Sequence, residues 1–214
     1  MTHNKIKILL VDDHAIMRMG LSSLLGTCDC FDVVGDAGDA ISGINKALTL
    51  RPDVVIMDLM MPDIDGVEAT RQLIRKFPCA NILILTTFGS ADGLAHALEA
   101  GARGAIMKSA AFAELTKAIK TVAAGATYVS PEIQQMISED PPVPILTSRQ
   151  AEILKSVTRG LSNVDIAKQF DISLQMVKEH MTVLLEKLGA ANRAEAVAIA
   201  LRKHLSSPRL RLSL

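Results

Sequence analysis

The sequence lacks any long apolar run. The strand-like runs at 6–11, 54–57 and 82–85 are far shorter than the roughly 18 to 20 residues that a membrane-spanning helix needs. The first residues, MTHNKIKILLVDD, pass from a polar start directly into an apolar run, with no signal-peptide pattern and no small-residue cleavage site. We therefore expect no transmembrane helix and a cytoplasmic protein.

Cysteine is scarce as well. Cys28, Cys30 and Cys79 are odd in number, and no two of them form a CxxC pair. This pattern indicates neither a disulfide framework nor a zinc cluster, so we interpret all three as reduced thiols.

The chain has no net charge, but its charges are distributed unevenly on the two sides of Pro141. Residues 1–140 carry 12 Lys and Arg against 17 Asp and Glu, a net charge of −5, whereas residues 141–214 carry 11 against 6, a net charge of +5. An acidic half and a basic half suggest different partners, cations for the first and nucleic acid for the second.

Length and composition favour two folded domains. A chain of 214 residues exceeds the usual size of one domain, and 49% hydrophobic with 21% charged residues indicates globular folding. Short apolar runs alternate with amphipathic stretches of helical length, the last of which is 113–123. The runs lie at 6–11, 31–35, 53–57, 81–86 and 104–108. Because they lack polar alternation, we predict a five-stranded doubly wound parallel α/β sheet with helices on both faces, in a domain spanning 1–124.

The chain changes character after Gly125. Pro141, Pro142 and Pro144 interrupt any helix there, so 125–144 is predicted to be a linker. Four helical patterns follow, with no strand-like run among them, at 148–158, 163–168, 174–188 and 192–204. We predict a small all-α domain over 145–205 and a frayed tail over 206–214.

Charged and hydroxyl side chains follow four of the five predicted strands. They are Asp12 and Asp13 after the first strand, Asp58 at the third, Thr86 at the fourth and Lys108 at the fifth. The carboxyl ends of strands in a doubly wound sheet line the binding crevice, so these groups should converge. Clustered carboxylates repel one another unless a cation lies among them, and such an oxygen site suits Mg²⁺. The pattern predicts an Mg²⁺-dependent phosphoryl site with Asp58 as nucleophile, Lys108 neutralising the phosphoryl oxygens and Thr86 bonding the product.

At these residues the sequence resembles the receiver domain of response regulators, a flavodoxin-like fold, over 5–124. The matching pieces are ILLVDDH (8–14), DVVIMDLMMPDIDGVEA (53–69), ILTT (84–87) and GAIMKS (104–109). The resemblance implies that Asp58 is the phosphoacceptor and that Thr86 and Lys108 act on the phosphoryl group. It also implies a metal site formed by Asp12, Asp13, Asp58 and the backbone carbonyl of Met60. Each piece alone has an ordinary structural explanation, such as a helix cap or a turn, but their joint occurrence at the strand ends argues against one.

One position departs from that family. Receivers usually carry Tyr or Phe three residues before the lysine, a ring that turns inward as the threonine moves, and here that position is Ala105. We expect the relay to run instead through Thr86 and the segment 87–93.

A competing enzymatic interpretation rests on Asp63-Ile64-Asp65-Gly66, which fits the DxDG core of haloacid-dehalogenase phosphatases. That motif needs its first aspartate directly at the end of a buried strand. Here the apolar run stops at Asp58, and Met61-Pro62 intervene, so the position of the motif argues against a phosphatase.

The second half has the pattern of a helix-turn-helix. Gly160 closes its first helix, Ser162 caps the second, and Ser173 caps a long third helix. Apolar positions of the third helix fall at i, i+4, i+7 and i+11 and predict a buried stripe of Val177, Met181, Leu184 and Leu188. The opposite face presents the side chains that would meet a DNA major groove, namely Gln175, Lys178, Glu179, Thr182 and Glu186.

These residues resemble the LuxR-type helix-turn-helix of the NarL/FixJ response regulators over 145–204, through LTSRQ, GLSN, DIA and VKEHM. The resemblance implies that Lys178 contacts the groove or a phosphate, and that Ser162, Asn163 and Thr182 contact the DNA backbone. Lys187 is a further predicted DNA-binding residue, which adds positive charge to the same domain. The last helix is the expected dimer surface, through Ala194, Val197, Ala198 and Leu201. The same apolar stripe would also serve packing within the monomer, and both interpretations stay open.

The third helix departs from the family in charge. Glu179, Val183 and Glu186 replace residues that are common there, and acids that face phosphates repel them. Glutamate can also accept a hydrogen bond from cytosine N4. We expect modest, salt-sensitive DNA binding that dimerisation strengthens.

Together these features predict a two-component response regulator rather than a turnover enzyme. A sensor histidine kinase would phosphorylate Asp58, and the phosphorylated homodimer would bind promoter DNA. The alternative is a regulator that acts by protein contact or binds DNA without phosphorylation.

Overall fold

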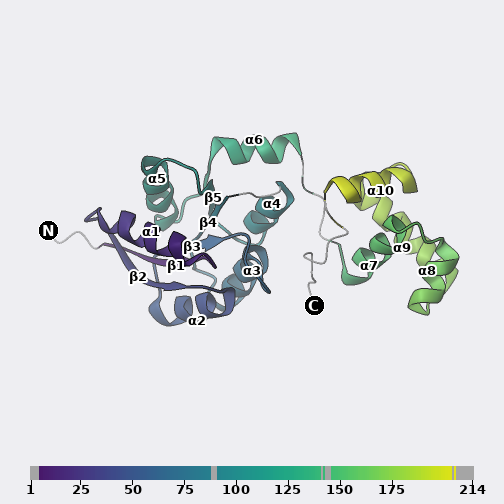
Figure 1. Ribbon diagram of the computed structural model, residues 1–214, viewed down its shortest axis with the longest axis horizontal. Coiled ribbons are helices and arrows are strands. Elements are labelled where there is room, and N and C mark those ends of the chain that lie inside the picture. The colour runs from purple at the N-terminus through teal and green to yellow at the C-terminus, as the bar shows by residue number, and fades with distance from the viewer. Residues whose placement is uncertain (1–4, 88–90, 141, 143–145, 204, 206–214) are drawn as a thin grey trace. The chain divides into compact units, whose positions relative to one another are not determined.

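The computed structural model describes residues 5–87, 91–140, 142, 146–203 and 205. The chain forms two compact units, Met1–Pro142 and Val143–Leu214 (Figure 1). Among the residues described, no helix combines the length and the apolar character that a membrane crossing requires.

The first unit is a parallel sheet in the order β2-β1-β3-β4-β5-β6, with helices on both faces (Figure 1). Its strands are β1 (Ile6–Val11), β2 (Phe31–Ala37), β3 (Val54–Asp58), β4 (Ile82–Thr86), β5 (Gly104–Met107) and β6 (Tyr128–Val129). Its helices are α1 (Ala15–Gly26), α2 (Ala40–Leu50), α3 (Gly66–Lys76), α4 (Ala91–Glu99), α5 (Phe112–Ala123) and α6 (Pro131–Glu139). The predicted doubly wound, flavodoxin-like architecture is confirmed.

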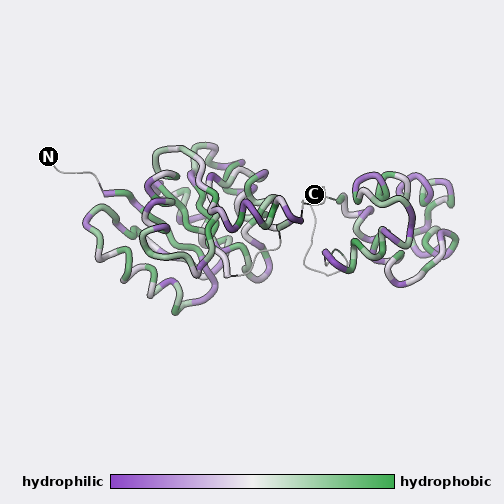
Figure 2. The backbone as a smooth tube through the Cα atoms, turned by 90° about the horizontal axis from the view of Figure 1, so that it is seen from above, coloured by the Kyte–Doolittle hydropathy of each residue, from purple (hydrophilic) through white to green (hydrophobic). Residues whose placement is uncertain are grey.

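The strands carry apolar side chains on both faces because both faces are covered. Ile8 and Leu10 of β1 pack in one cluster with residues of α1 and α5, whereas Leu9 and Val11 pack in another with residues of α2, α3 and α4. Figure 2 shows these apolar segments in green through the middle of the unit. Double coverage accounts for the absence of polar alternation in the sequence.

The sheet has one strand more than the five predicted. The segment 125–144, predicted as a linker, contains β6 and α6. Because β6 has only two residues, it leaves no periodic pattern in the sequence, and Pro131 stands in the first turn of α6, where proline is tolerated. The backbone N–H of Ser130 donates to the carbonyl of Ala105 at 3.0 Å, which extends the pairing of β6 with β5. A side chain at Gly104 would come within 2.7 Å of the Tyr128 carbonyl, so glycine is needed for this approach.

Helix α6 is integrated into the core of the first unit. Ile133 is fully buried and belongs to the same apolar cluster as Ala105 and Leu94. Met136 and Ile137 pack against that cluster from the same helix. The segment after β6 therefore contacts the strand that leads to Lys108.

In its described residues the second unit is all helical, as predicted, and it has a core of its own. The predicted tail, 206–214, lies outside the described residues. Its helices are α7 (Ser148–Thr158), α8 (Asn163–Phe170), α9 (Leu174–Leu188) and α10 (Arg193–Arg202). Their first turns are capped by side chains, including a reciprocal capping box between Thr147 and Gln150. The predicted buried stripe of α9 is confirmed, since the side chains that point inward are Val177, Met181, Leu184 and Leu188.

Candidate functional site

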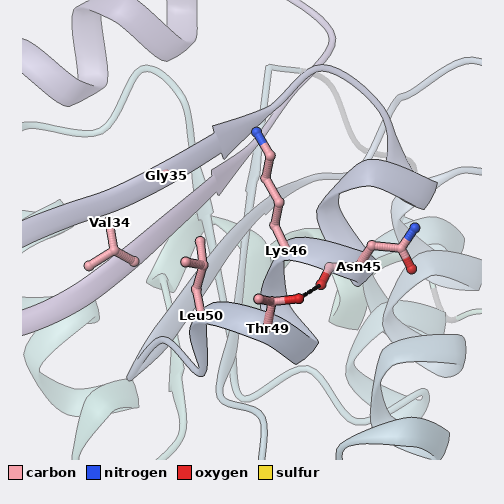
Figure 3. Close-up of a pocket in the computed structure, with 6 residues that line it drawn as sticks. All are labelled: Val34, Gly35, Asn45, Lys46, Thr49 and Leu50. Atoms are coloured by element: carbon pink, nitrogen blue, oxygen red, sulfur yellow. Dashed lines mark hydrogen bonds between the residues drawn. The ribbon is translucent and has the colours of Figure 1, made fainter.

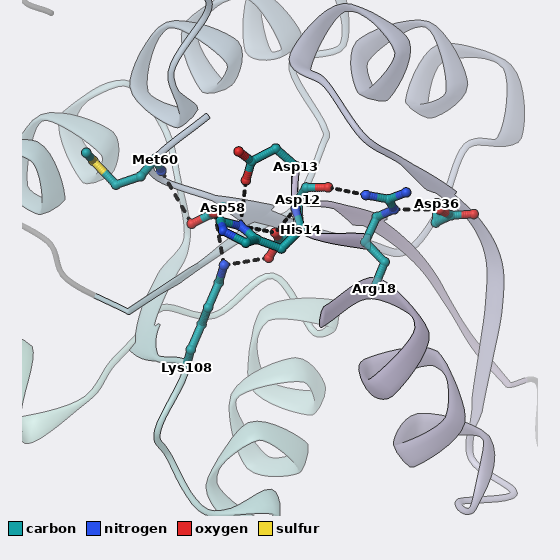
Figure 4. A network of polar contacts seen from close by, with 8 residues as sticks. All are labelled: Asp12, Asp13, His14, Arg18, Asp36, Asp58, Met60 and Lys108. Carbon is teal, nitrogen blue, oxygen red and sulfur yellow. Dashed lines mark hydrogen bonds and ion pairs between the residues drawn. The ribbon is translucent and has the colours of Figure 1, made fainter. Parts of the chain in front are cut away.

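The predicted acidic pocket forms at the carboxyl ends of the central strands (Figure 4). Asp12 and Asp13 follow β1, Asp58 ends β3 and Lys108 follows β5. Because β1, β3, β4 and β5 are neighbours in the sheet, side chains from distant parts of the sequence meet at one edge.

Lys108 joins two of the carboxylates. Its Nζ lies 2.6 Å from Asp12 Oδ2 and 2.9 Å from Asp58 Oδ2. Burial raises the pKa of the Asp58 carboxyl, and the hydrogen bond and charge of Lys108 oppose this shift without cancelling it. Burial opposes the charge of Lys108, but the hydrogen bonds and charges of Asp12 and Asp58 outweigh it and raise the pKa of that ammonium. Asp12 and Asp58 therefore keep Lys108 charged, whereas burial makes the ionised form of Asp58 energetically costly.

The pocket holds more negative charge than Lys108 can neutralise. Ligand atoms of Asp12, Asp13, His14 and Asp58 all lie within 4.8 Å of one another. Three carboxylates beside one ammonium leave room for a divalent cation, which is the usual partner of clustered oxygen ligands.

His14 is a member of this cluster that sequence reasoning missed. Its Nδ1 lies 2.8 Å from Asp13 Oδ1 and 3.4 Å from Asp12 Oδ1. Its backbone N–H donates to Asp12 Oδ1 at 2.8 Å, which fixes the turn after β1. The only signal in the sequence was its position directly after the two aspartates.

Arg18 was also missed, and it supports the pocket from α1. Its Nη1 donates to the carbonyl of Asp12 at 2.7 Å, and its Nε donates to Asp36 Oδ2 at 2.7 Å (Figure 4). Asp36 belongs to β2, so this contact joins α1, β1 and β2 at the edge that carries the acids. No local sequence pattern connects these three residues.

Thr86 and Ala105 occupy their predicted positions. The Thr86 hydroxyl is fully buried and has no hydrogen-bond partner among the described residues, while the Thr86 carbonyl accepts from the N–H of Lys108 at 2.7 Å. Ala105 is fully buried, and Ile133 of α6 lies in the same apolar cluster. The region without the family's aromatic ring is therefore packed with aliphatic side chains.

The loop after β3 depends on one glycine. An ideal Cβ on Gly66 would lie 2.3 Å from the Asp58 carbonyl oxygen, and the N–H of Gly66 donates to Leu59 at 2.9 Å. Met60, whose carbonyl was predicted as a metal ligand, follows Asp58 in this loop, and its N–H lies 3.3 Å from Asp58 Oδ1. Close backbone approach at Gly66 keeps Asp58 and Met60 at the same edge of the sheet.

The DxDG interpretation receives no support from the geometry. Asp63 has a left-handed backbone with φ of 62°, in the loop beyond the end of β3. Asp65 accepts the N–H of Glu68 at 2.9 Å and caps α3. The second aspartate of that motif thus serves as a helix cap.

One shallow pocket lies away from these residues, between β2 and α2 (Figure 3). Its lining residues are Val34, Gly35, Asn45, Lys46, Thr49 and Leu50. The Lys46 ammonium donates to the carbonyl of Asp36, and the Thr49 hydroxyl donates to Asn45 at 3.0 Å. Since these polar groups are engaged within the fold, the pocket offers little for recognition.

The predicted reading face of α9 is exposed, with Gln175, Lys178, Glu179, Thr182 and Glu186 all open to solvent. Gln175 Nε2 donates to Glu179 Oε1 at 3.2 Å, which orients that carboxylate along the helix. Lys187 lies apart from this face, half-buried, and its ammonium donates to Gln150 Oε1 at 3.1 Å. It connects α9 to the start of α7.

Ser162 and Asn163, predicted to contact the DNA backbone, both have partners within the unit. The Ser162 hydroxyl donates to Asp165 Oδ2 at 2.6 Å, a hydrogen bond that lowers the pKa of Asp165. Asn163 Oδ1 accepts from Arg193 Nη1 at 3.0 Å, and Arg193 also donates to the Leu161 carbonyl. Arg193 therefore joins α10 to the start of α8.

The predicted dimer residues of α10 fall mainly on its outer side. Ala194, Ala198 and Leu201 are exposed, whereas Val197 is half-buried and packs against the core. Ala196 and Ala200 provide the packing of this helix within the unit. The outer stripe is distinct from the buried one.

Comparison with known proteins covers nearly the whole chain. Residues 8–120 match the model of the response regulator receiver domain, and residues 144–200 match that of the bacterial regulatory proteins of the luxR family. The oxygen regulatory protein NreC of Staphylococcus carnosus is 36% identical over an alignment of 214 residues. The alignment covers 94% of this chain and 99% of NreC.

Solved structures agree with these matches. The response regulator ChrA of a heme-sensing two-component system is 34% identical, with a TM-score of 0.57 over 94% of this chain and 98% of ChrA. RcsB from Salmonella enterica serovar Typhimurium, bound to promoter P1flhDC in the presence of phosphomimetic BeF3⁻, is 25% identical, with a TM-score of 0.65 over 92% of this chain and 98% of RcsB. Both halves match in the same order as in these relatives, and the chain belongs to the two-component response regulators of the NarL/FixJ subfamily, which join a receiver domain to a LuxR-type DNA-binding domain.

Proposed function

We propose that phosphorylation of Asp58 by a sensor histidine kinase switches this response regulator, and that the phosphorylated homodimer binds promoter DNA. The observation that carries the proposal is the buried contact of Lys108 with both Asp12 and Asp58 at the carboxyl ends of β1 and β3. It places a fixed positive charge beside the carboxylate that would accept the phosphoryl group.

In the proposed transfer, a carboxylate oxygen of Asp58 forms a bond to phosphorus while the bond from phosphorus to the kinase histidine breaks. The released imidazole takes up a proton. The Lys108 ammonium neutralises the incoming oxygens, and the unpartnered Thr86 hydroxyl donates a hydrogen bond to one of them. Phosphorylation therefore replaces an Asp58–Lys108 pair with a larger, more negative group that engages Thr86.

Asp12, Asp13, Asp58 and the Met60 carbonyl are the residues that would hold Mg²⁺. The excess of carboxylates over ammonium groups in the pocket, and the approach of their oxygens to within 4.8 Å, fit a divalent cation. When bound, Mg²⁺ supplies positive charge that lowers the repulsion between the carboxylates and the phosphoryl oxygens.

We propose that the signal leaves the pocket along β5 and α6. Lys108 follows β5, Ala105 of β5 accepts the Ser130 N–H, and Ile133 of α6 packs in the cluster that contains Ala105. A shift of Thr86 and Lys108 would therefore reach α6 through backbone pairing and aliphatic contacts. This path takes the place of the family's aromatic ring, since position 105 is alanine. The other path, predicted from the sequence through Thr86 and the segment 87–93, includes residues 88–90, which lie outside the described residues.

For the output, the exposed side chains of α9 would enter the major groove, with Lys178 as the main cationic contact. The exposed side chains Ala194, Ala198 and Leu201 of α10 would meet a second copy, and Val197 would add to that contact from its half-buried position. The chain would hold its phosphoryl group as a signal and would not turn over a separate substrate.

A single experiment tests the switch. The full chain is incubated with acetyl phosphate and Mg²⁺, and its intact mass, its assembly state and its retardation of promoter fragments are measured. We expect the intact mass of the protein to increase by one phosphate, with increased dimerisation and DNA affinity. The increase in mass should be absent in Asp58→Ala and retained in Asp63→Asn. Phosphate that is lost only in Asp63→Asn would overturn the assignment of the nucleophile.

A second candidate function is supported by the acids on α9. Glu179 and Glu186 are exposed on the proposed reading face and would repel phosphates. A regulator that acts by protein contact, or that binds DNA without phosphorylation, would take up phosphate in the same assay with no change in assembly or DNA affinity.

A further inference from the structure

We infer that the His14 imidazole is an additional ligand of the cation site and makes it favour divalent transition-metal ions over Mg²⁺. This inference rests on the proposed cation site at Asp12, Asp13 and Asp58. It adds a nitrogen donor to a site otherwise composed of oxygens.

The position of the ring is the first argument. His14 Nδ1 lies 2.8 Å from Asp13 Oδ1 and 3.4 Å from Asp12 Oδ1, so the imidazole lies over the edge of the carboxylate pair (Figure 4). One nitrogen of His14 and one oxygen each of Asp12, Asp13 and Asp58 lie within 4.8 Å of one another. An ion among these atoms would have the imidazole within reach as well as the carboxylates.

The second argument is that the ring neither caps α1 nor packs in the core. His14 stands at the N-cap of α1, yet its side chain makes no capping hydrogen bond, whereas Asp39 and Asp65 cap α2 and α3 with theirs. Its side chain is 70% exposed, so it adds little to the core. The side-chain contacts described for His14 are with the two acids that follow β1.

Ligand chemistry then sets the preference. Mg²⁺ is a hard ion that takes oxygen ligands and retains several waters. Imidazole suits Co²⁺, Zn²⁺ and related borderline ions, so a nitrogen donor beside three carboxylates raises the affinity for those ions more than the affinity for Mg²⁺. The main effect of His14 would thus be on selectivity among cations.

The test compares cation affinities of the full-length protein and four variants. Co²⁺ is titrated by its visible absorption, which reports its ligands, and Mg²⁺ is measured by competition against it. His14→Leu removes the nitrogen donor, Asp13→Asn weakens the whole site, and His180→Leu removes a histidine elsewhere; His3→Leu, near the same end of the sequence, serves as a second histidine control.

We expect His14→Leu to lower the affinity for Co²⁺ by about tenfold or more, to alter the Co²⁺ spectrum, and to change the affinity for Mg²⁺ by less than about twofold. The two histidine controls, His180→Leu and His3→Leu, should leave unchanged the Asp13-dependent component, which is the part of the Co²⁺ binding that Asp13→Asn weakens. An unchanged ratio of Co²⁺ to Mg²⁺ affinity in His14→Leu, with the Asp13-dependent component intact, would overturn the role of His14 alone. Absence of any Asp13-dependent component in the unmutated protein would overturn the proposed cation site itself.

Discussion

Asp58 and Lys108 form a buried ion pair in which the ammonium nitrogen lies 2.9 Å from a carboxylate oxygen, and their side chains are only 3% and 4% exposed. The pair does not fully compensate the burial of Asp58, because the pKa of that carboxyl is raised above its usual value. The folded protein therefore binds a proton at Asp58 more readily than the unfolded chain does. The Asp58 carboxyl ionises at a lower pH in the unfolded chain than in the folded protein. The stability of the first unit therefore falls as the pH rises from the pKa of Asp58 in the unfolded chain through its pKa in the folded protein.

We accordingly predict that Asp58→Asn raises the melting temperature of the first unit at neutral pH without divalent cations, because it removes a carboxylate that burial penalises. The difference from the unmutated protein should shrink below about pH 4, where Asp58 is protonated in both states. Thermal unfolding between pH 3 and pH 8 measures it. Asp32→Asn, an exposed site on β2, is the matched control and should show no comparable gain. A lower melting temperature for Asp58→Asn at pH 7 would contradict the sign of this argument.

Gly66 supplies a second prediction, because a Cβ there would lie 2.3 Å from the Asp58 carbonyl oxygen. Gly66→Ala should force the loop after β3 to move and should reduce the free energy of unfolding by about 1–3 kcal/mol. Gly20→Ala is the matched control. Apart from its chain neighbours and the backbone of its own helix, nothing lies within 4 Å of a Cβ at Gly20, and alanine favours a helix over glycine by about 0.5–1 kcal/mol. Denaturant unfolding of the two variants should therefore give opposite signs, and equal effects would argue against the close contact.

The positions of the main pocket residues could be predicted because Asp12, Asp58 and Lys108 each lie at or directly after an apolar run. The topology of a parallel sheet then places them at one edge. The contacts of Arg18 could not be predicted in this way. Arg18 lies on α1 and Asp36 on β2, and only the directions of their side chains bring them together.

The segment after α5 marks the other limit of the sequence argument. A two-residue strand such as β6 carries no period, and the prolines at 141–144 favoured a linker over the whole segment. The apolar residues Ile133, Met136 and Ile137, spaced as i, i+3 and i+4, were the signal that favoured a packed helix. The docking of α6 beside β5 depends on the small residues Gly104 and Ala105, which are informative only once the strand order is known.

Ile133 allows the integration of α6 to be measured. The side chain is fully buried in the first unit, so Ile133→Ala should reduce the free energy of unfolding of that unit by about 2–5 kcal/mol. Ile41→Ala on α2, where the side chain is 59% exposed, should cost far less. If the two variants unfold alike, α6 does not contribute to the core, and the proposed route from β5 to α6 fails with it.

Lys178 and Glu179 make the charge balance of α9 testable. Both are exposed on the same helix, and they carry opposite charges next to each other in the sequence. Lys178→Ala should weaken binding about equally for all DNA sequences and reduce the slope of log affinity against log salt by about 1, because one phosphate contact is lost. Glu179→Gln should strengthen binding at low salt by about fivefold, on the order of 1 kcal/mol, which is the interaction of two unit charges about 4 Å apart in water.

The matched controls for α9 lie in the first unit, where Lys120→Ala and Glu99→Gln make the same charge changes at exposed helical positions. Retardation of promoter fragments by the phosphorylated protein across a salt series measures all four variants. If Glu179 reads a cytosine, Glu179→Gln will instead weaken binding to the preferred site while strengthening binding to unrelated DNA, because a base contact is lost together with a repulsion. Equal effects of the α9 substitutions and their controls would show that net charge alone governs binding, and α9 would lose its place as the reading helix.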